Sequence, residues 1–296
     1  MNAGCEDKQK CIVCDDEMHI KIKLKANIFQ CPSCGLQIAD IRSRTGAILH
    51  NQDEAERERA LYGLRMSNYD IIIRNLPTLL HQNSISGLEV GCAHGWFLEA
   101  VEKSHSNIDC TGIEPQKEYY CIAKSKFGKD AKLINGFFPQ DIPKGAEKFD
   151  FIIFNDVFEH IPNTDEVLNA CYAQLTQNGI LILNLPLAQG FIYKMSNFLY
   201  RAIRKKQYLE RLWQLDYVSP HLYYFNKGNL ARLLRKKGLE LVKYHRVDVF
   251  SKGSINSRIK LGGGGISKFS IFCINILLPL FKYFPEDCGC FYFQKQ

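Results

Sequence analysis

Short runs of apolar and β-branched residues alternate with amphipathic stretches along most of this chain of 296 residues. From Ser86 onward, the runs with strand character are GLEVGC, DCTGIEP, AKLINGFF, KFDFIIFND and GILILNLP. Between them lie stretches with helical spacing, among them WFLEAVEKSH and TDEVLNACYAQLT. This alternation predicts a parallel sheet covered by helices on both faces. We therefore expect a doubly wound α/β fold that binds its ligand at the carboxyl ends of the strands.

Two insertions interrupt this pattern. Residues 189–217 have apolar side chains at helical spacing, and the basic residues lie elsewhere on the same stretch. The apolar positions are Phe191, Ile192, Met195, Phe198, Leu199 and Ile203. The stretch can form a lid over an acceptor pocket or a surface helix with a solvated basic face, and both interpretations stay open.

The second insertion, 251–287, contains the glycine run 262–265 and then thirteen apolar-rich residues, 269–281. That run is shorter than the roughly 20 residues that a membrane-spanning helix needs. Lysines flank it, so residues 266–285 can lie in a membrane interface, line a groove for a lipid-linked substrate, or pack against the domain. Ahead of the first strand, residues 51–80 begin with acidic residues and become amphipathic, which predicts a helix.

The N-terminal cysteines have the spacing of a zinc ribbon. Cys11 and Cys14 form one C-x-x-C knuckle, and Cys31 and Cys34 form a second. Each knuckle can present two thiolates to one tetrahedral ion, and four cysteine ligands make a closed, structural site. The stretch KIKLKANIF between the knuckles alternates like a strand, and Gly35 suits a turn with positive φ.

Composition and charge narrow the class of protein. Apolar residues make up 46% of the chain, which excludes a disordered or fibrous protein. Lysine and arginine exceed the acids by 7, and residues 194–237 carry eleven cations against two acids. An anionic partner is therefore worth considering. Twelve cysteines, with no apolar signal region in the opening MNAGCEDKQK, indicate a reducing, cytoplasmic setting.

The ends of the first two expected strands suit a nucleoside ligand. The first strand runs into Glu89-Val-Gly91-Cys-Ala93-His-Gly95, where glycines allow the backbone to lie against a ligand. The second ends at Glu114, nineteen residues beyond Gly95, where an acid can accept hydrogen bonds from both ribose hydroxyls. Gly95 is followed by Trp-Phe-Leu, which disfavours the G-x-G-x-x-G fingerprint of nicotinamide dehydrogenases.

Four motifs, in this order, resemble those of class I S-adenosylmethionine-dependent methyltransferases. They are the turn at 89–95, V-F-E-H-I at 157–161, G-I-L-I-L-N-x-P at 179–186 and H-L-Y-x-F at 221–225. The resemblance covers about residues 86–249. It implies a seven-stranded Rossmann-like sheet in which residues 291–295 form an antiparallel seventh strand.

The resemblance also implies a set of cofactor-binding residues. Glu89, Gly91, Ala93 and Gly95 would surround the methionine part of S-adenosylmethionine, Glu114 would hold the ribose, Gly136 and Phe137 would neighbour the adenine, and Asn155 would line the floor. A glycine is usual at the position of Ala93. Its extra methyl group predicts either a slightly different position of the ligand or a negative φ at this residue.

Glu159, His160 and His221 are the candidate catalytic residues on the acceptor side. Either histidine can serve as general base for a hydroxyl, because imidazole titrates near neutral pH. Asp156-x-x-Glu159-His160 with the later His221 also resembles the E-x-x-E-H motif of small-RNA 2′-O-methyltransferases and ubiquinone-pathway O-methyltransferases. In those families the motif holds a divalent ion, which here would polarise the acceptor hydroxyl.

We therefore predict a zinc ribbon over 1–50, an amphipathic helical connector over 51–85 and a class I methyltransferase domain over 86–296. The expected activity is S-adenosylmethionine-dependent O-methylation of a small-molecule, sugar or lipid-linked glycan acceptor. The expected location is the cytoplasm, with membrane-surface contact through 266–285. An RNA methyltransferase that uses the ribbon and residues 194–237, or a non-catalytic binding module of this fold, is the alternative.

Overall fold

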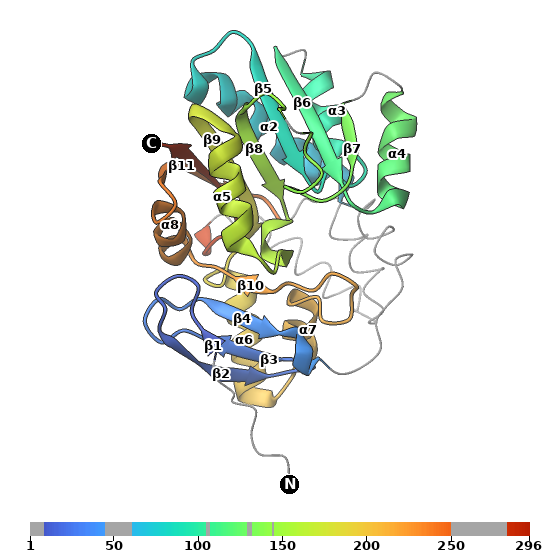
Figure 1. Cartoon of the computed structure of the whole chain (residues 1–296). Coiled ribbons are helices and arrows are strands. Elements are labelled where there is room, and N and C mark those ends of the chain that lie inside the picture. The colour runs from blue at the N-terminus through green and yellow to red at the C-terminus, as the bar shows by residue number, and fades with distance from the viewer. Residues whose placement is uncertain (1–8, 45–60, 105–106, 129–131, 144, 250–282) are drawn as a thin grey trace.

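The computed structural model describes residues 9–44, 61–104, 107–128, 132–143, 145–249 and 283–296, which form two stacked lobes (Figure 1). Several predictions fall outside these residues: the acidic start of the connector helix, the glycine run 262–265 and the apolar run 269–281. In the part of the chain that is described, no helix is long and apolar enough to cross a membrane.

A seven-stranded mixed sheet organises the larger lobe, in the order β11-β12-β9-β8-β5-β6-β7. Its strands are β5 (Ile85–Val90), β6 (Ile108–Glu114), β7 (Leu133–Asn135), β8 (Phe149–Asn155), β9 (Leu175–Pro186), β11 (Leu239–Val247) and β12 (Cys288–Lys295). Six strands run in one direction, and β12 alone of the seven runs the opposite way, antiparallel to both β9 and β11. The predicted doubly wound α/β fold with an antiparallel seventh strand is confirmed.

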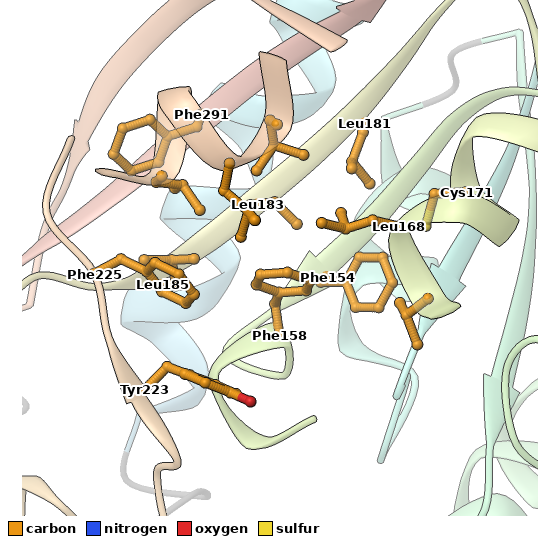
Figure 2. Packing of buried hydrophobic residues seen from close by; sticks show 14 of the residues in the cluster. Phe154, Phe158, Leu168, Cys171, Leu181, Leu183, Leu185, Tyr223, Phe225 and Phe291 are labelled. Carbon is orange, nitrogen blue, oxygen red and sulfur yellow. The ribbon is translucent and has the colours of Figure 1, made fainter. Parts of the chain in front are cut away.

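Helices cover both faces of this sheet because its central strands are apolar on both sides. They are α2 (Tyr62–Leu80), α3 (Trp96–Lys103), α4 (Lys117–Phe127), α5 (Thr164–Gln174) and α8 (Lys227–Arg235). Along β8, Ile153 packs in the cluster that contains residues of α2 and α3, whereas Phe154 packs with residues of α5 and α8. Figure 2 shows the cluster that contains Phe154, where Phe154 and Phe158 lie between Leu168 and Phe225. This core therefore fixes the loop after β8, from which the acceptor-side residues come.

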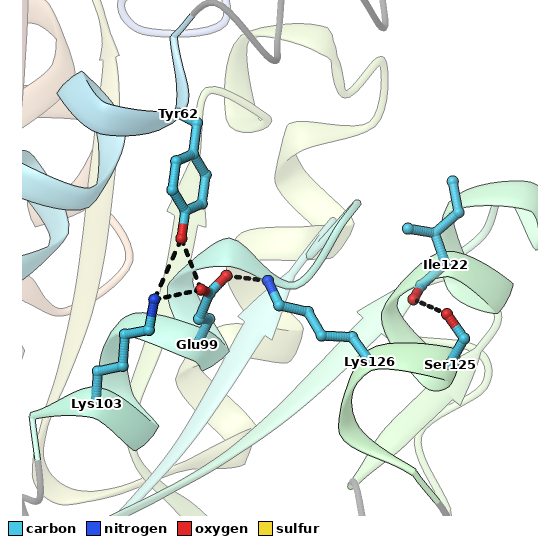
Figure 3. Close-up of polar contacts among 6 residues, drawn as sticks. All are labelled: Tyr62, Glu99, Lys103, Ile122, Ser125 and Lys126. Atoms are coloured by element: carbon cyan, nitrogen blue, oxygen red, sulfur yellow. Dashed lines mark hydrogen bonds and ion pairs between the residues drawn. The ribbon is translucent and has the colours of Figure 1, made fainter.

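Three helices beside the carboxyl ends of the strands are joined by one carboxylate (Figure 3). Glu99 of α3 accepts hydrogen bonds from the hydroxyl of Tyr62 on α2 and from Lys103, both at 2.6 Å. Its second oxygen pairs with Lys126 of α4. With only 8% of its surface exposed, Glu99 holds α2 and α4 against the helix that follows the glycine turn.

The smaller lobe is a five-stranded antiparallel sheet in the order β1-β2-β3-β4-β10. Its strands are β1 (Gln9–Lys10), β2 (Glu17–Lys23), β3 (Asn27–Gln30), β4 (Gln37–Asp40) and β10 (Tyr223–Tyr224), and the 3-10 turn η1 (Ile41–Ser43) follows β4. The stretch KIKLKANIF, expected to alternate as a strand, is split by a turn in which Leu24 N–H donates to Ala26 O. Apolar and polar residues go on alternating through the turn, so the sequence pattern alone does not show where β2 ends and β3 begins.

The last strand of the small sheet belongs to the larger lobe. β10 begins two residues after His221 and pairs with β4, so that Tyr223 lies opposite Ile38. Helices α6 (Phe191–Ile203) and α7 (Gln207–Leu212), from the first insertion, pack on this sheet through Tyr193, Leu209 and Trp213. The N-terminal lobe is therefore built into the acceptor side of the larger domain.

Candidate active site

The turn after β5 adopts the backbone conformation that a glycine-rich ligand loop needs. Gly91 and Gly95 have φ of +72° and +70°. A Cβ on Gly91 would lie 2.8 Å from Cγ2 of Val157, so only glycine fits beside the loop after β8. Ala93 has φ of +44°, so the expectation of a negative φ at this residue is wrong.

A carboxylate from the neighbouring strand compensates for the unusual conformation of Ala93. Glu114, at the end of β6, accepts the N–H of Ala93 at 3.0 Å and the N–H of Gln116 at 2.8 Å. Its side chain is buried, so these bonds hold the carboxylate firmly at the predicted ribose position. The same bonds hold the turn against the second strand.

Glu89 lies at the bottom of the cavity beneath this turn. Its Oε1 accepts a hydrogen bond from Nδ2 of Asn155 at 3.0 Å, and Asn184 lies behind Asn155. Among the described residues, Glu89 Oε2 has no hydrogen-bond partner, although the side chain is only 2% exposed. Burial raises the pKa of Glu89 to about 8. A buried acceptor of this kind requires a donor from a ligand, and the ammonium group of S-adenosylmethionine fits that requirement.

Arg65 of α2 lines the same cavity and was not predicted from the sequence. Its guanidinium lies 3.4 Å from Oδ2 of Asp156 and 5.9 Å from the ring centroid of Trp96. The cavity is lined by Arg65, Tyr69, Glu89, Gly91, Cys92, Ala93, His94, Trp96, Phe97 and Asn155. The amphipathic pattern predicted a helix here, but it gave no signal for which cation lines the cavity.

Gly136 and Phe137 lie at the next strand end, apart from the cavity lining. Gly136 N–H donates to Glu114 O at 3.1 Å, and a Cβ on Gly136 would collide with Asp141. The Phe137 side chain is 64% exposed. A large apolar side chain left in water beside the ribose carboxylate is available for stacking, so the prediction of an adenine neighbour remains open.

On the acceptor side, Glu159, His160 and His221 come together as the sequence predicted. The turn η2 (Phe158–His160) brings the first two, and His221 returns from the segment before β10. One ligand atom from each of the three lies within 4.8 Å of those of the other two. His221 Nε2 is 3.9 Å from Glu159 Oε1, and the two imidazole centroids are 4.7 Å apart.

Hydrogen bonds orient both imidazoles of this cluster. His160 Nδ1 lies 2.9 Å from the carbonyl oxygen of Pro220, which can only accept, so Nδ1 carries the proton and Nε2 is the basic nitrogen. The ring Nε2 of His221 lies 2.9 Å from Nε2 of Gln214, and the backbone N–H of His221 donates to Trp213 O. His160 is partly exposed whereas His221 is buried, so His160 is the more accessible of the two.

The carboxyl of Glu159 is the most deeply buried group of the cluster. It is 1% exposed, and neither oxygen has a hydrogen-bond partner among the described residues. Burial, and then the nearby negative charge of Asp156, raise its pKa well above the ordinary value. Asp156 itself faces Arg65 and is not part of the three-residue group, so the four-residue ion site expected with Asp156 is not assembled.

The four ribbon cysteines converge at one point in the smaller lobe. Sγ of Cys11 is 3.5 Å from that of Cys34, Sγ of Cys14 is 3.3 Å from that of Cys31, and all four lie within 4.8 Å of one another. Tetrahedral zinc with bonds of about 2.3 Å would separate its sulfur ligands by about 3.8 Å. The N–H of Val13 points at Cys11 Sγ and that of Cys34 at Cys31 Sγ, as expected around thiolates.

The basic segment 194–237 does not form one continuous cationic surface. Four of its cations, Lys227, Arg235, Lys236 and Lys237, pair with Glu286, Glu240, Asp15 and Asp165. Among the described residues, no ion pair involves the cations on α6 or directly after it, which are Lys194, Arg201, Arg204, Lys205 and Lys206. The structure therefore limits the nucleic-acid interpretation to the region of α6.

Residues 57–244, more than half of the chain, match the profile of a family described as a methyltransferase domain. The chain belongs to this methyltransferase family. The match runs from the helix that carries Arg65 to the strand β11, so it includes the cofactor cavity and the acceptor cluster. Glu89, Glu114 and Glu159 are thus carboxylates of a methyltransferase domain.

Relatives and solved structures are consistent with this membership. The methyltransferase is 30% identical over 105 residues to a ubiquinone biosynthesis O-methyltransferase of Actinobacillus pleuropneumoniae, a match of 33% of this chain and 44% of the relative. The match therefore spans less than half of the relative's length. Its fold is similar to that of an S-adenosylmethionine-dependent methyltransferase of Thermotoga maritima, with a TM-score of 0.51 and 16% identity. The match covers 82% of this chain and 95% of the Thermotoga chain. The fold is also similar to that of the plantazolicin methyltransferase BpumL in complex with S-adenosylhomocysteine, at 15% identity, TM-score 0.51 and coverage of 82% and 88%.

Proposed function

We propose that this methyltransferase transfers a methyl group from S-adenosylmethionine to a hydroxyl oxygen of a small-molecule, sugar or lipid-linked glycan acceptor. The observation that carries the proposal is the cluster of Glu159, His160 and His221 beside the glycine turn. Val157, one residue before η2, packs directly on Gly91. The cluster is therefore attached to the loop proposed to hold the cofactor. The O-methyltransferase relative supports a hydroxyl acceptor.

The residues of the cavity suit the charges of the cofactor. Within the cavity, Glu89 offers a buried oxygen without a partner among the described residues for the ammonium group, and Arg65 offers a cation for the carboxylate. Glu114, bonded to the lining residue Ala93, would accept from the ribose hydroxyls. When bound, S-adenosylmethionine supplies a methyl group activated by a positively charged sulfur. The protein then needs chiefly to position the acceptor in line with that methyl group and to remove one proton.

His160 is the proposed general base, because its tautomer leaves Nε2 to accept the hydroxyl proton. Transfer of the methyl group to the acceptor oxygen would break its bond to sulfur and leave the electron pair on sulfur. The acceptor proton moves to His160, and the positive charge that appears there lies beside Glu159. Glu159 and His221 are positioning residues in this account, since both are buried whereas His160 is partly exposed.

We also propose that the four-cysteine cluster holds one structural zinc ion. The sulfur spacing and the N–H groups aimed at Cys11 and Cys31 support this. Four thiolates fill the coordination shell, so the ion would stabilise the ribbon and not contact the acceptor.

The test is transfer of labelled methyl from S-adenosylmethionine to phenols, catechols and sugars, followed by mass analysis of the product. We expect His160→Gln to lower turnover by about 100-fold or more, because general-base catalysis is worth that much. His19→Gln, on the ribbon strand β2, is the matched control and is expected to turn over normally.

Metal analysis after chelation separates this account from the divalent-ion alternative for the same cluster. One zinc per chain, with full activity after removal of any other ion, supports His160 as base. A second ion that is lost in Glu159→Gln and that activity requires would contradict it. Unchanged turnover in His160→Gln would contradict it as well.

A further inference from the structure

Helix α6 turns its apolar stripe outward, away from the protein. Residues of its inner face, Tyr193 and Ser196, are buried, whereas Phe198 is 63%, Ile203 56% and Met195 43% exposed. Met195, Phe198 and Ala202 follow one another at the spacing of one helix face, and Ala202 is also exposed. An amphipathic helix that served only to complete the core would show the opposite orientation.

The surface around this stripe is strongly positive. Its exposed cations are Lys194, Arg201, Arg204, Lys205 and Lys206. None of them makes an ion pair with a residue in the described ranges, and the sequence has no acid between residues 188 and 209. We call the exposed apolar residues Met195, Phe198 and Ile203 together with these five cations the α6 patch.

The inner face of α6 is held in place, so the outward orientation is built into the fold. Tyr193 donates to Oε1 of Gln37 on β4 at 2.5 Å and accepts from Nε1 of Trp213 at 3.2 Å. At the start of the helix, Ile192 N–H donates to Asp287 at 2.7 Å. These contacts fix the rotation of α6 from both its face and its N-terminus.

We propose that the α6 patch docks this protein on an anionic lipid bilayer. An apolar stripe flanked by lysines and arginines matches the interface, where apolar side chains enter the acyl boundary and cations meet lipid phosphates. A nucleic acid would use the cations but leave Met195 and Ile203 in water. A protein partner could bind the apolar stripe, but it would not need five cations around it. The proposal does not depend on the acceptor or on catalysis.

The test is co-sedimentation of the full chain with vesicles of phosphatidylglycerol and phosphatidylcholine in equal parts, against pure phosphatidylcholine. Phe198→Asp and Met195→Asp each place a charge in the stripe, and we expect partitioning to fall by about tenfold. Arg204→Gln combined with Lys205→Gln is expected to weaken binding to the anionic vesicles alone. Ile122→Asp is the matched control. Ile122 lies on α4 (Figure 3), and its exposed fraction of 42% is close to the 43% of Met195.

Each outcome decides the proposal. Binding that needs anionic lipid and is lost in Phe198→Asp, but not in Ile122→Asp, supports it. Three results overturn it: no sedimentation of the wild type, equal loss in Ile122→Asp, or binding unaffected by Phe198→Asp. A shift from dimer to monomer in Phe198→Asp, without vesicle binding by the wild type, assigns the patch to a second copy. If the wild type binds RNA but not vesicles, and Phe198→Asp still binds RNA, the cations are assigned to nucleic acid.

Discussion

Glu89 shows how one residue can prepare the cavity for a cationic ligand. Burial raises its pKa to about 8 and leaves one oxygen without a partner among the described residues. The carboxyl is therefore mostly protonated near neutral pH when the cavity is empty of cations. A bound ammonium group would favour the ionised form, so ligand binding and proton release are coupled at this residue.

Glu89 should also make the stability of the ligand-free protein depend on pH. Its pKa is about 8 in the folded protein and about 4.3 in an unfolded chain. The folded state thus binds more protons between these values, and the free energy of unfolding falls as the pH rises through the window. Glu89→Gln removes this titration, so its stability relative to wild type should improve by up to a few kcal/mol from about pH 5 to about pH 8.

Urea denaturation at the two pH values measures this difference. Glu102→Gln, an exposed substitution on α3, controls for the loss of one charge. A stability difference between Glu89→Gln and wild type that does not change with pH would show that Glu89 is already ionised in the folded protein.

At the scale of elements, hydrogen bonds join the lobe that holds the four cysteines to the cluster of Glu159, His160 and His221. Ala39 N–H, on β4, donates to Leu222 O at 2.9 Å, and Leu222 N–H donates to Glu159 O at 2.8 Å. Asn226 Nδ2 donates to Cys34 O at 2.9 Å. The knuckle that would hold zinc thus supports the segment from His221 to α8, while the cofactor turn is held by β5, β6 and Gly91.

Loss of the proposed zinc should therefore affect turnover more than cofactor binding. We expect Cys34→Ser to lose the metal and to lower turnover by about tenfold or more, since misplacing a positioned group by an ångström has effects of that size. The affinity for S-adenosylhomocysteine should change by less than about threefold, because substitutions at distant sites with no shared partners affect each other little.

Elemental analysis, turnover and calorimetry on the same preparation test this separation. Cys121→Ser, at an exposed position on α4, is the matched control. Equal losses of turnover and cofactor affinity in Cys34→Ser would mean that the ribbon supports the whole domain and not the acceptor side alone.

At the scale of the whole molecule, the patterns that depend on one element or on chain order could be predicted from the sequence. The buried run of β8 and the ordered strand-end motifs are local, and they indicated the sheet and the positions of Glu89, Glu114 and Glu159. The pairing of β10 with β4 involves two residues in each strand and depends on tertiary packing. No local pattern reveals it.

Sequence patterns also leave open which way a side chain or a helix face points in the folded protein. Periodicity showed that α6 has an apolar stripe, but the anchors on Gln37 and Asp287 decide that it faces outward. Arg65 points to the cavity for the same kind of reason. Ala93 has a positive φ, and its N–H donates to Glu114 on a different strand. Of the two alternatives that its extra methyl group allowed, the negative φ is excluded and the shifted position of the ligand stays a prediction.

The central claim is that this cavity binds S-adenosylmethionine through the carboxylate at the end of β6. Calorimetric titration of the purified protein with S-adenosylmethionine tests it most directly, with Glu114→Ala as the variant. Asp109→Ala, an exposed acid on the same strand, is the control for loss of charge. We predict micromolar binding that Asp109→Ala retains and that Glu114→Ala weakens by about tenfold or more, the cost of losing charged hydrogen bonds. No binding by the folded wild type, or equal binding by Glu114→Ala, would contradict the account.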